Sequence, residues 1–228
     1  MEAIVLAGGF GTRLRELVPD LPKPMAPVAG RPFLEIVLHS LASRGFTRVL
    51  LALGYRAAAI TAHFGNAFEG ISIVYAIERE PLGTGGAIRL AREQCEADHV
   101  FVFNGDTYLD LEVAAVEVCW QTWRKPVIVV REVPDTARYG RVEVQNSRFI
   151  RFTDKGIPGP GLINAGCYVF PRNLLDDFPL GKSFSLEADF LAHAVQQQSF
   201  RVFRTNGMFI DIGIPADYLR AQTELADV

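Results

Sequence analysis

Glycines and cationic side chains gather near the start of the chain. Residues 6–25 read LAGGFGTRLRELVPDLPKPM. Glycine lets backbone N–H groups approach a ligand closely, and successive N–H groups form a concavity that suits anions. Two prolines flank Lys23 and stiffen the backbone that carries its ammonium group. The stretch therefore predicts a phosphate-binding loop rather than a solvated basic turn.

Two aspartates occupy positions that suit a bound cation. Asp106 follows the apolar run 100–104, where a strand gives way to a loop, and open α/β sheets bind ligands at that edge. Asp211 lies inside the apolar segment FIDIG, where a buried carboxylate is costly unless it meets a metal ion or a strong partner. Together they predict an Mg²⁺ site completed by substrate phosphates. The alternatives are a turn-capping role for Asp106 and a hydrogen-bonded buried carboxylate for Asp211.

Two common phosphate-binding motifs do not fit the glycine-rich stretch. A P-loop requires G-x-x-x-x-G-K-[ST], and no lysine followed by serine or threonine stands at that spacing. A dinucleotide fingerprint requires G-x-G-x-x-G, but counting from Gly9 and Gly11 places Leu14 at the third glycine. The pattern disfavours a kinase or ATPase and a nicotinamide or flavin enzyme.

The elements that must position these residues alternate in the first half of the chain. Expected strands lie at 3–7, 48–53, 71–76 and 100–104, with expected helices at 33–44, 56–65 and 84–94. This alternation is typical of βαβ units, and hence of a mostly parallel sheet covered on both faces.

The second half predicts a different pattern, with antiparallel or mixed strands joined by short turns. Expected strands lie at 127–133, 140–145, 147–153, 164–170, 200–205 and 208–213, with helices at about 186–198 and from about 215. The Pro/Gly-rich segment 154–161 is predicted to be a surface loop.

Composition favours a globular chain with one sizeable core. Apolar residues make up 49% and charged residues 21% of 228 residues, and an α/β domain of this length commonly stays undivided. The start lacks the regions of a signal peptide, and no apolar stretch approaches roughly 20 residues, so we expect a cytoplasmic protein with no membrane partner. A net charge of −3 gives no global attraction for nucleic acid. The three cysteines lack C-x-x-C spacing and predict neither a zinc site nor a disulfide framework.

The motifs, taken in order, resemble those of the sugar-phosphate nucleotidyltransferases, which join a nucleoside triphosphate to a sugar 1-phosphate and release pyrophosphate. The resemblance begins with G-G-x-G-T-R-L at 8–14 and with LPKPM around Lys23. It continues through EREPLGTGGAI, FNGDTYLD, FTDKG, NAGCYVF, SLEAD and FIDIGIPADY. Within the family, the guanylyltransferases that act on D-glycero-D-manno-heptose 1-phosphate are the most similar, with mannose 1-phosphate enzymes as near relatives.

The resemblance implies a Rossmann-like three-layer α/β fold with a mostly parallel mixed sheet. It implies one nucleotidyltransferase domain over 1–228, with a nucleotide-binding half at about 1–125 and a sugar-binding half at about 126–228. The expected reaction transfers GMP from GTP to the sugar 1-phosphate and yields an activated heptose for capsule or lipopolysaccharide. A sugar phosphate is already ionised near neutral pH, so the site needs charge neutralisation and alignment more than a general base.

The resemblance assigns catalysis to Arg13, Lys23 and Asp106, and metal binding to Asp106 and Asp211. Arg13 is expected to act as a forked donor to the β- and γ-phosphates. Lys23 is expected to place a compact charge near the reacting phosphates, and Mg²⁺ is the expected cofactor.

The base-recognition segment gives the next set of expectations. The implied nucleotide-binding residues are Leu6, Ala7, Gly8, Gly9, Gly11, Thr12, Arg13, Glu78, Glu80, Pro81, Gly83 and Thr84. A carboxylate at Glu78 or Glu80 suits the N1–H and N2–H₂ donors of guanine, while Gly83 and Gly85 let the backbone approach the base. An exposed glutamate pair is the ordinary alternative for these two residues.

The implied sugar-phosphate-binding residues are Gly140, Asp154, Lys155, Asn164 and Glu187. Asp154 would accept hydrogen bonds from ring hydroxyls, and Lys155 would lie near the 1-phosphate. Asn164 and Glu187 would add hydroxyl contacts. An ordinary surface position stays open for each of them.

Other functions stay open beside the leading one. A mannose 1-phosphate guanylyltransferase, or a uridylyl- or thymidylyltransferase, would use the same motifs. A non-catalytic sugar-nucleotide-binding regulatory protein would share the fold, because fold alone does not fix function. The oligomeric state, a homo-oligomer included, also stays open.

Overall fold

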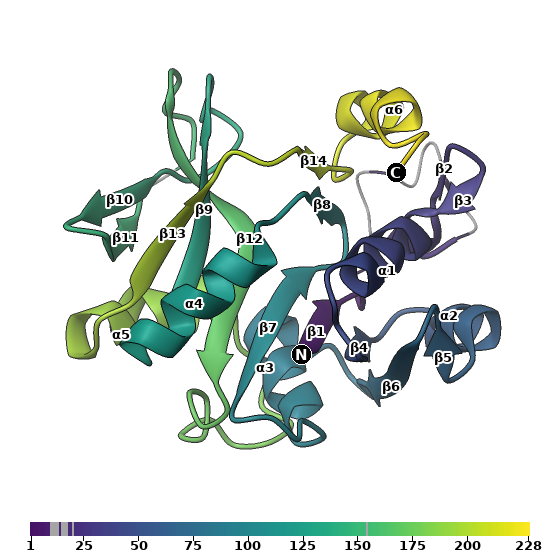
Figure 1. Cartoon of the computed structure of the whole chain (residues 1–228), viewed down its shortest axis with the longest axis horizontal. Helices are drawn as coiled ribbons and strands as arrows, with labels where there is room; N and C mark the ends of the chain where they lie inside the picture. Colours follow the sequence, from purple (N-terminus) through teal and green to yellow (C-terminus); the bar gives the residue numbers. More distant parts are fainter. Residues whose placement is uncertain (10–13, 15–17, 20, 154) are drawn as a thin grey trace.

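The structure is a computed structural model that describes residues 1–9, 14, 18–19, 21–153 and 155–228. The strands of its large sheet are β1 (Glu2–Leu6), β4 (Arg48–Leu53), β5 (Ala67–Phe68), β6 (Ile71–Ile77), β7 (His99–Asn104), β9 (Val127–Val133), β10 (Val142–Gln145), β11 (Arg148–Phe152), β12 (Gly161–Pro171) and β13 (Arg201–Thr205). Within the described ranges, these ten strands follow the order β10–β11–β13–β9–β12–β7–β1–β4–β6–β5 (Figure 1).

The two halves of this sheet differ in strand direction. Strands β6, β4, β1 and β7 are mutually parallel. Strand β12 is antiparallel to β7 on one side and to β9 on the other, whereas β13 is parallel to β9. The expected α/β class with a mixed sheet is confirmed.

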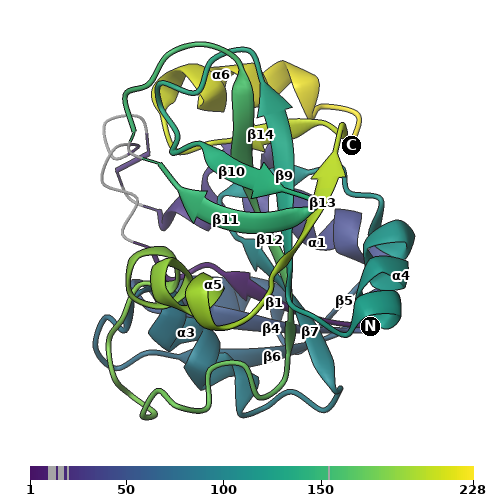
Figure 2. The ribbon, with the colours of Figure 1, turned by 90° about the vertical axis from the view of Figure 1, so that its left-hand side faces the viewer.

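Helices cover both faces of the sheet. They are α1 (Phe33–Ser43), α2 (Ala57–Phe64), α3 (Gly83–Arg92), α4 (Val113–Trp123), α5 (Ala192–Gln197) and α6 (Pro215–Glu224), with a π-helical turn η3 (Leu186–Leu191) leading into α5. Figure 2 shows α3 and α5 on one side of the sheet and α1 and α4 on the other. Adjacent strand residues point to opposite faces, so Ile4 of β1 is buried with α3 and η3 while Val5 is buried with α1 and α4.

Four short strands and a 3₁₀ turn complete the described chain. They are β2 (Pro27–Val28), β3 (Arg31–Pro32), β8 (Thr107–Leu109), β14 (Phe209–Asp211) and the turn η2 (Lys23–Met25). Strands β2 and β3 pair with each other, and β14 pairs with β8. Both ribbons lie beside the large sheet in Figure 1.

Most of the expected elements are present, with one helix missed. The strand expected at 48–53 coincides with β4, and the helix expected at 33–44 differs from α1 by one residue. No element was predicted over 113–123, where the structure has α4. No helix within the described ranges is long and apolar enough to cross a membrane.

Candidate active site

The parallel strands end at one edge of the sheet, and a cavity of about 320 Å³ lies there. Because β1, β4, β6 and β7 run in the same direction, the loops after them meet at this edge. We call this space the first cavity; Gly8, Glu78 and Asp106 are among its lining residues. A Cβ atom on Gly8 would lie 2.7 Å from Glu78 Oε1 and 3.0 Å from the Gly54 nitrogen, so the loops approach closely here and a larger residue would displace the Glu78 side chain.

Eight of the expected nucleotide-binding residues line the first cavity. Four follow or end β1: Leu6, Ala7, Gly8 and Gly9. Four lie between β6 and the first turn of α3: Glu78, Pro81, Gly83 and Thr84. Glu80 is exposed and does not line the cavity, while Gly11, Thr12 and Arg13 lie outside the described residues.

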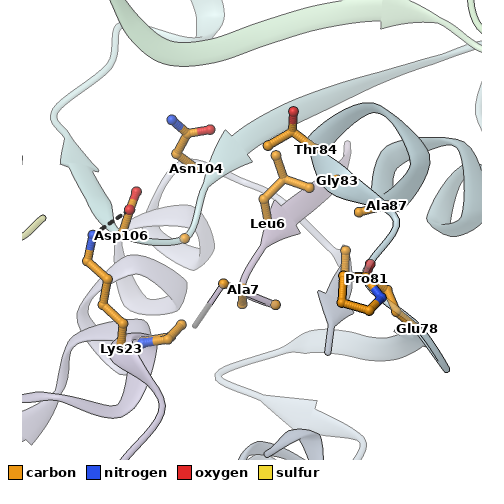
Figure 3. Close-up of a pocket in the computed structure, with 15 residues that line it drawn as sticks. Leu6, Ala7, Lys23, Glu78, Pro81, Gly83, Thr84, Ala87, Asn104 and Asp106 are labelled. Carbon is orange, nitrogen blue, oxygen red and sulfur yellow. Dashed lines mark hydrogen bonds and ion pairs between the residues drawn. The ribbon is translucent and has the colours of Figure 1, made fainter. Parts of the chain in front are cut away.

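The two ends of the first cavity differ in chemistry. Figure 3 shows Lys23 and Asp106 on one side and Glu78 and Pro81 on the other, with Leu6 and Ala7 between them. The N–H of Leu82 donates to Glu78 Oε2 at 2.5 Å. Burial raises the pKa of the Glu78 carboxyl above its ordinary value, although this hydrogen bond acts in the opposite direction. The site thus offers a partly buried carboxylate opposite a cluster of charge.

A two-stranded ribbon brings the two predicted metal ligands together. Strands β8 and β14 pair in antiparallel register, with Asp211 opposite Thr107. The N–H of Ile212 also donates to the carbonyl of Asp106 at 3.0 Å. Asp106 immediately precedes Thr107, so the ribbon places both carboxylates at the same edge of the large sheet.

Lys23 lies against both carboxylates. Its ammonium nitrogen is 2.5 Å from Asp106 Oδ2 and 3.9 Å from Asp211 Oδ1, and its side chain is 10% exposed. The turn that carries it begins after Pro22, and Pro24 and Met25 are buried beneath it. The flanking prolines therefore fix the backbone at a point where one cation faces two anions.

The carboxylate pair fits a hard divalent cation. Burial, and then the charge of Asp106, raise the pKa of Asp211, whereas Lys23, the Gly213 N–H and Arg138 lower it. Two ionised carboxylates that lie close together and partly buried repel each other and lose hydration. A cation beside both of them offsets this cost, as the Lys23 ammonium group does here. Among the described residues, no group of three or more His, Cys, Asp or Glu side chains forms a metal site, so a bound Mg²⁺ would take its other ligands from phosphate and water.

A larger cavity of about 550 Å³ adjoins this pair, and we call it the second cavity. Four expected sugar-phosphate-binding residues line it: Gly140, Lys155, Asn164 and Glu187. Asp154 lies outside the described residues. Asn104 lines both cavities, Asp106 lines the first and Asp211 lines the second, so the two spaces meet at the carboxylate pair.

Asn164 and Glu187 form one polar group in the second cavity. The Asn164 side-chain amide donates to Glu187 Oε1 at 2.7 Å and also to the Tyr168 hydroxyl, and its oxygen accepts from the Gly166 N–H at 3.0 Å. The register of β12 against β9 shifts between Asn164 and Cys167, and Gly166 has a φ of +71°. A glycine adopts this positive φ at little cost, and the irregular segment begins at Asn164, which lines the second cavity.

Sequence reasoning missed Arg138 and Tyr139. The Arg138 guanidinium forms an ion pair with Asp217 and lies 4.0 Å from Asp211. It also lies over the aromatic ring of Tyr139, which lines the second cavity. Both residues directly precede the predicted Gly140, so an Arg-Tyr pair before a glycine was the available signal. None of the four histidines lines either cavity.

Gly85 serves a different purpose from the one expected. It does not line the first cavity, and a Cβ atom there would lie 2.1 Å from the ring of Phe184. At Gly83, which has a φ of +68°, a Cβ atom would lie 2.6 Å from the Phe184 carbonyl oxygen. These glycines admit the segment before η3, because no side chain fits between α3 and Phe184.

Comparisons with known proteins show the family to which the chain belongs. The family model described as "Nucleotidyl transferase" matches residues 2–228. The chain is 41% identical over 226 residues to a D-glycero-alpha-D-manno-heptose 1-phosphate guanylyltransferase from Aneurinibacillus thermoaerophilus, covering 99% of this chain and 98% of that protein. The corresponding guanylyltransferase from Campylobacter jejuni is 38% identical over 219 residues, covering 96% and 97%.

A solved structure is similar over nearly the whole chain. It is HddC from Yersinia pseudotuberculosis complexed with GMP-PN, with a TM-score of 0.87, 36% identity and 98% of each chain covered. This similarity confirms the expected Rossmann-like three-layer fold.

Proposed function

We propose that this chain, which belongs to the nucleotidyl transferase family, transfers GMP from GTP to D-glycero-D-manno-heptose 1-phosphate and releases pyrophosphate. The observation that carries the proposal is the meeting of two cavities at Lys23, Asp106 and Asp211. The choice of substrates follows the two relatives of matching length, which are guanylyltransferases for this sugar phosphate.

The reaction is an in-line displacement at phosphorus. An oxygen of the sugar 1-phosphate attacks the α-phosphorus of GTP, a new P–O bond forms, and the bond to the β-phosphate oxygen breaks with its electron pair leaving on pyrophosphate. Proton abstraction is not needed, because the attacking phosphate is already ionised. The protein must align two polyanions and neutralise their charge.

Charge at the reacting phosphates would come from the junction of the cavities. Lys23 supplies an ammonium group on a stiffened turn, and Arg138 adds a second cation near Asp211. Asp106 and Asp211 would hold the metal ion, which supplies charge neutralisation to the phosphates when bound. Lys155, on the wall of the second cavity, would face the incoming 1-phosphate.

The base would lie at the Glu78 end of the first cavity. Guanine presents N1–H and N2–H₂ donors, which suit an ionised carboxylate, whereas adenine presents an acceptor at N1. Of the two glutamates considered, Glu78 is the one on the cavity wall. Its Oε1 lies against Gly8 and Gly54, where a Cβ atom would be 2.7 Å and 3.2 Å from that oxygen.

A substrate matrix tests the proposed function. Nucleoside triphosphates GTP, ATP, UTP and dTTP are combined with heptose 1-phosphate, mannose 1-phosphate and glucose 1-phosphate, and pyrophosphate release is measured. We expect the GTP and heptose 1-phosphate pair to be fastest. A faster reaction with mannose 1-phosphate, UTP or dTTP would assign another sugar nucleotide, and no pyrophosphate with any pair would favour a regulatory binding protein.

Replacing Glu78 with glutamine should narrow the preference for GTP. We expect the wild-type kcat/KM for GTP to exceed that for ATP by at least about tenfold, since tenfold requires only about 1.4 kcal/mol. The raised pKa of Glu78 means that protonation begins at a higher pH than for an exposed glutamate, so this ratio should also fall as the pH is lowered. Glu80→Gln is the matched control, and an unchanged ratio in Glu78→Gln would assign base reading to backbone groups.

A further inference from the structure

A seam of hydrogen bonds joins the wall of the first cavity to the wall of the second. We use the word seam for the contact between residues 82–86, at the start of α3, and residues 184–186, at the start of η3. The Phe184 N–H donates to the Leu82 carbonyl at 2.9 Å, and the Gly85 N–H donates to the Phe184 carbonyl at 3.0 Å. The Leu186 N–H donates to Thr84 Oγ1 at 2.9 Å.

Thr84 is the one side chain that bonds across this seam among the described residues. It lines the first cavity, yet its hydroxyl oxygen holds the backbone of η3. A hydroxyl that accepts one hydrogen bond keeps its own proton for another acceptor. Thr84 therefore stands in the wall of the first cavity while its hydroxyl oxygen holds the Leu186 N–H.

The residue after Leu186 is Glu187, which lines the second cavity and accepts from Asn164 at 2.7 Å. The rest of the turn is held locally, since Ser185 Oγ accepts from the Ala188 N–H at 3.2 Å and the Ser185 N–H donates to Asp189 at 2.7 Å. These local bonds shape the turn, but they do not fix where it lies relative to α3. The bond to Thr84 does that directly before Glu187.

The seam also reaches the base end of the first cavity. Glu78 accepts from the Leu82 N–H at 2.5 Å, and the carbonyl of Leu82 in turn accepts from Phe184. Hydrogen bonds thus connect the carboxylate of Glu78 with the backbone of residues 184–186, and the chain continues from Leu186 directly into Glu187. A ligand that orders residues 78–84 would order Glu187 as well.

We propose that Thr84 is a positioning residue for the sugar 1-phosphate: its hydroxyl fixes Leu186 and thereby Glu187, so that nucleotide in the first cavity strengthens sugar-phosphate binding in the second. This proposal rests on the proposed function for the identity of the two ligands. The coupling is reciprocal, because a free energy that links two binding equilibria changes both affinities by the same factor.

Thr84→Val removes the hydroxyl and keeps the shape of the side chain. With pyrophosphate release as the assay, we expect the KM for heptose 1-phosphate to rise about fivefold to tenfold, the effect of one lost hydrogen bond, while the KM for GTP changes by less than about threefold. Thr84→Ser keeps the hydroxyl group and should therefore have the wild-type KM for heptose 1-phosphate. Thr122→Val, on the exposed face of α4, is the matched control and should leave both constants unchanged.

Other kinetic results would overturn the proposal. A rise in the KM for GTP alone would make Thr84 a nucleotide contact and nothing more. Equal losses in Thr84→Val and Thr84→Ser would point to packing rather than to the hydroxyl.

Amide hydrogen exchange on the wild-type protein tests the same idea without a substitution. A non-hydrolysable GTP analogue, added without sugar phosphate, should slow exchange at Leu186 and in the peptide 184–190, whereas exchange in α4 should not change. If exchange in that peptide is unchanged while the analogue is bound, the proposed coupling across the seam is wrong. Absence of pyrophosphate release with every sugar phosphate would refute the proposed function instead, and the exchange result would still decide the coupling.

Discussion

Replacing Lys23 with methionine should cut turnover by roughly 10²–10³-fold and yet tighten the binding of a divalent cation to the nucleotide-free protein. The loss of rate is the effect expected when one positioned charge is removed from a site of phosphoryl transfer. The gain in cation affinity follows from the distances of 2.5 and 3.9 Å between the ammonium nitrogen and the carboxylates of Asp106 and Asp211. An ammonium group there competes with any metal ion for the same oxygens.

Pyrophosphate release and titration with Mn²⁺, followed by electron paramagnetic resonance, measure the two effects separately. Lys125→Met is the matched control, because Lys125 is exposed and lies in neither cavity. Equal Mn²⁺ affinity in Lys23→Met and the wild type would show that the ammonium group does not compete. Near-normal turnover in Lys23→Met would show that Lys23 has no catalytic role.

Asp211→Asn should lower turnover by roughly 10³-fold without destabilising the fold. A metal-binding carboxylate contributes several kcal/mol of charge stabilisation, and about 1.4 kcal/mol corresponds to a factor of ten. Asp106→Asn should show a similar loss of turnover. Asp177→Asn, on an exposed surface outside both cavities, should turn over like the wild type.

The stability of Asp211→Asn should depend on pH in a defined direction. Because the pKa of Asp211 is raised in the folded protein, the folded state binds that proton more tightly than the unfolded state, and its contribution to stability is lost as the pH rises through the folded pKa. The neutral asparagine avoids this loss. The melting temperature of the variant minus that of the wild type should therefore be largest at neutral pH and shrink toward pH 3.8, the ordinary pKa of the group. A difference that grows on acidification would contradict the pKa direction.

The fold was largely predictable because its first half has strong local signals. Continuous apolar runs such as 48–53 belong to strands buried on both faces, and α3 carries the polar residues Thr84, Arg89 and Arg92 beside its buried apolar ones. Helix α4 lacks that contrast: Val116 and Trp120 are buried, but Val118 is 64% exposed and Trp123 is 50% exposed, so apolar residues surround the helix. A hydrophobic pattern without a polar face carries little periodic signal.

The sequence allowed the residues of the candidate site to be predicted, but not how they lie relative to one another. Motif spacing singles out Lys23, Asp106 and Asp211, but their mutual approach depends on the register between β8 and β14, which no local pattern encodes. The same limit explains Gly85, where a glycine near a base-recognition motif was assigned to the ligand although the ring of Phe184 requires it. Tertiary contacts between distant segments decide both.

Strand β12 has a mechanical consequence for the whole reaction. It is bonded to β7 over Cys167–Pro171 and to β9 over Gly161–Val169, with the shift after Asn164, so the strands beside the first cavity and those beside the second belong to one continuous sheet. A hinge rotation between them would have to distort this ladder of hydrogen bonds, so the sheet itself opposes a rigid-body closure of the two cavities. Under the proposed function, this sheet would hold the nucleotide and the sugar 1-phosphate at a set separation. A change of preferred sugar would then come from side chains that line the second cavity, such as Asn164 and Glu187, with the sheet unchanged.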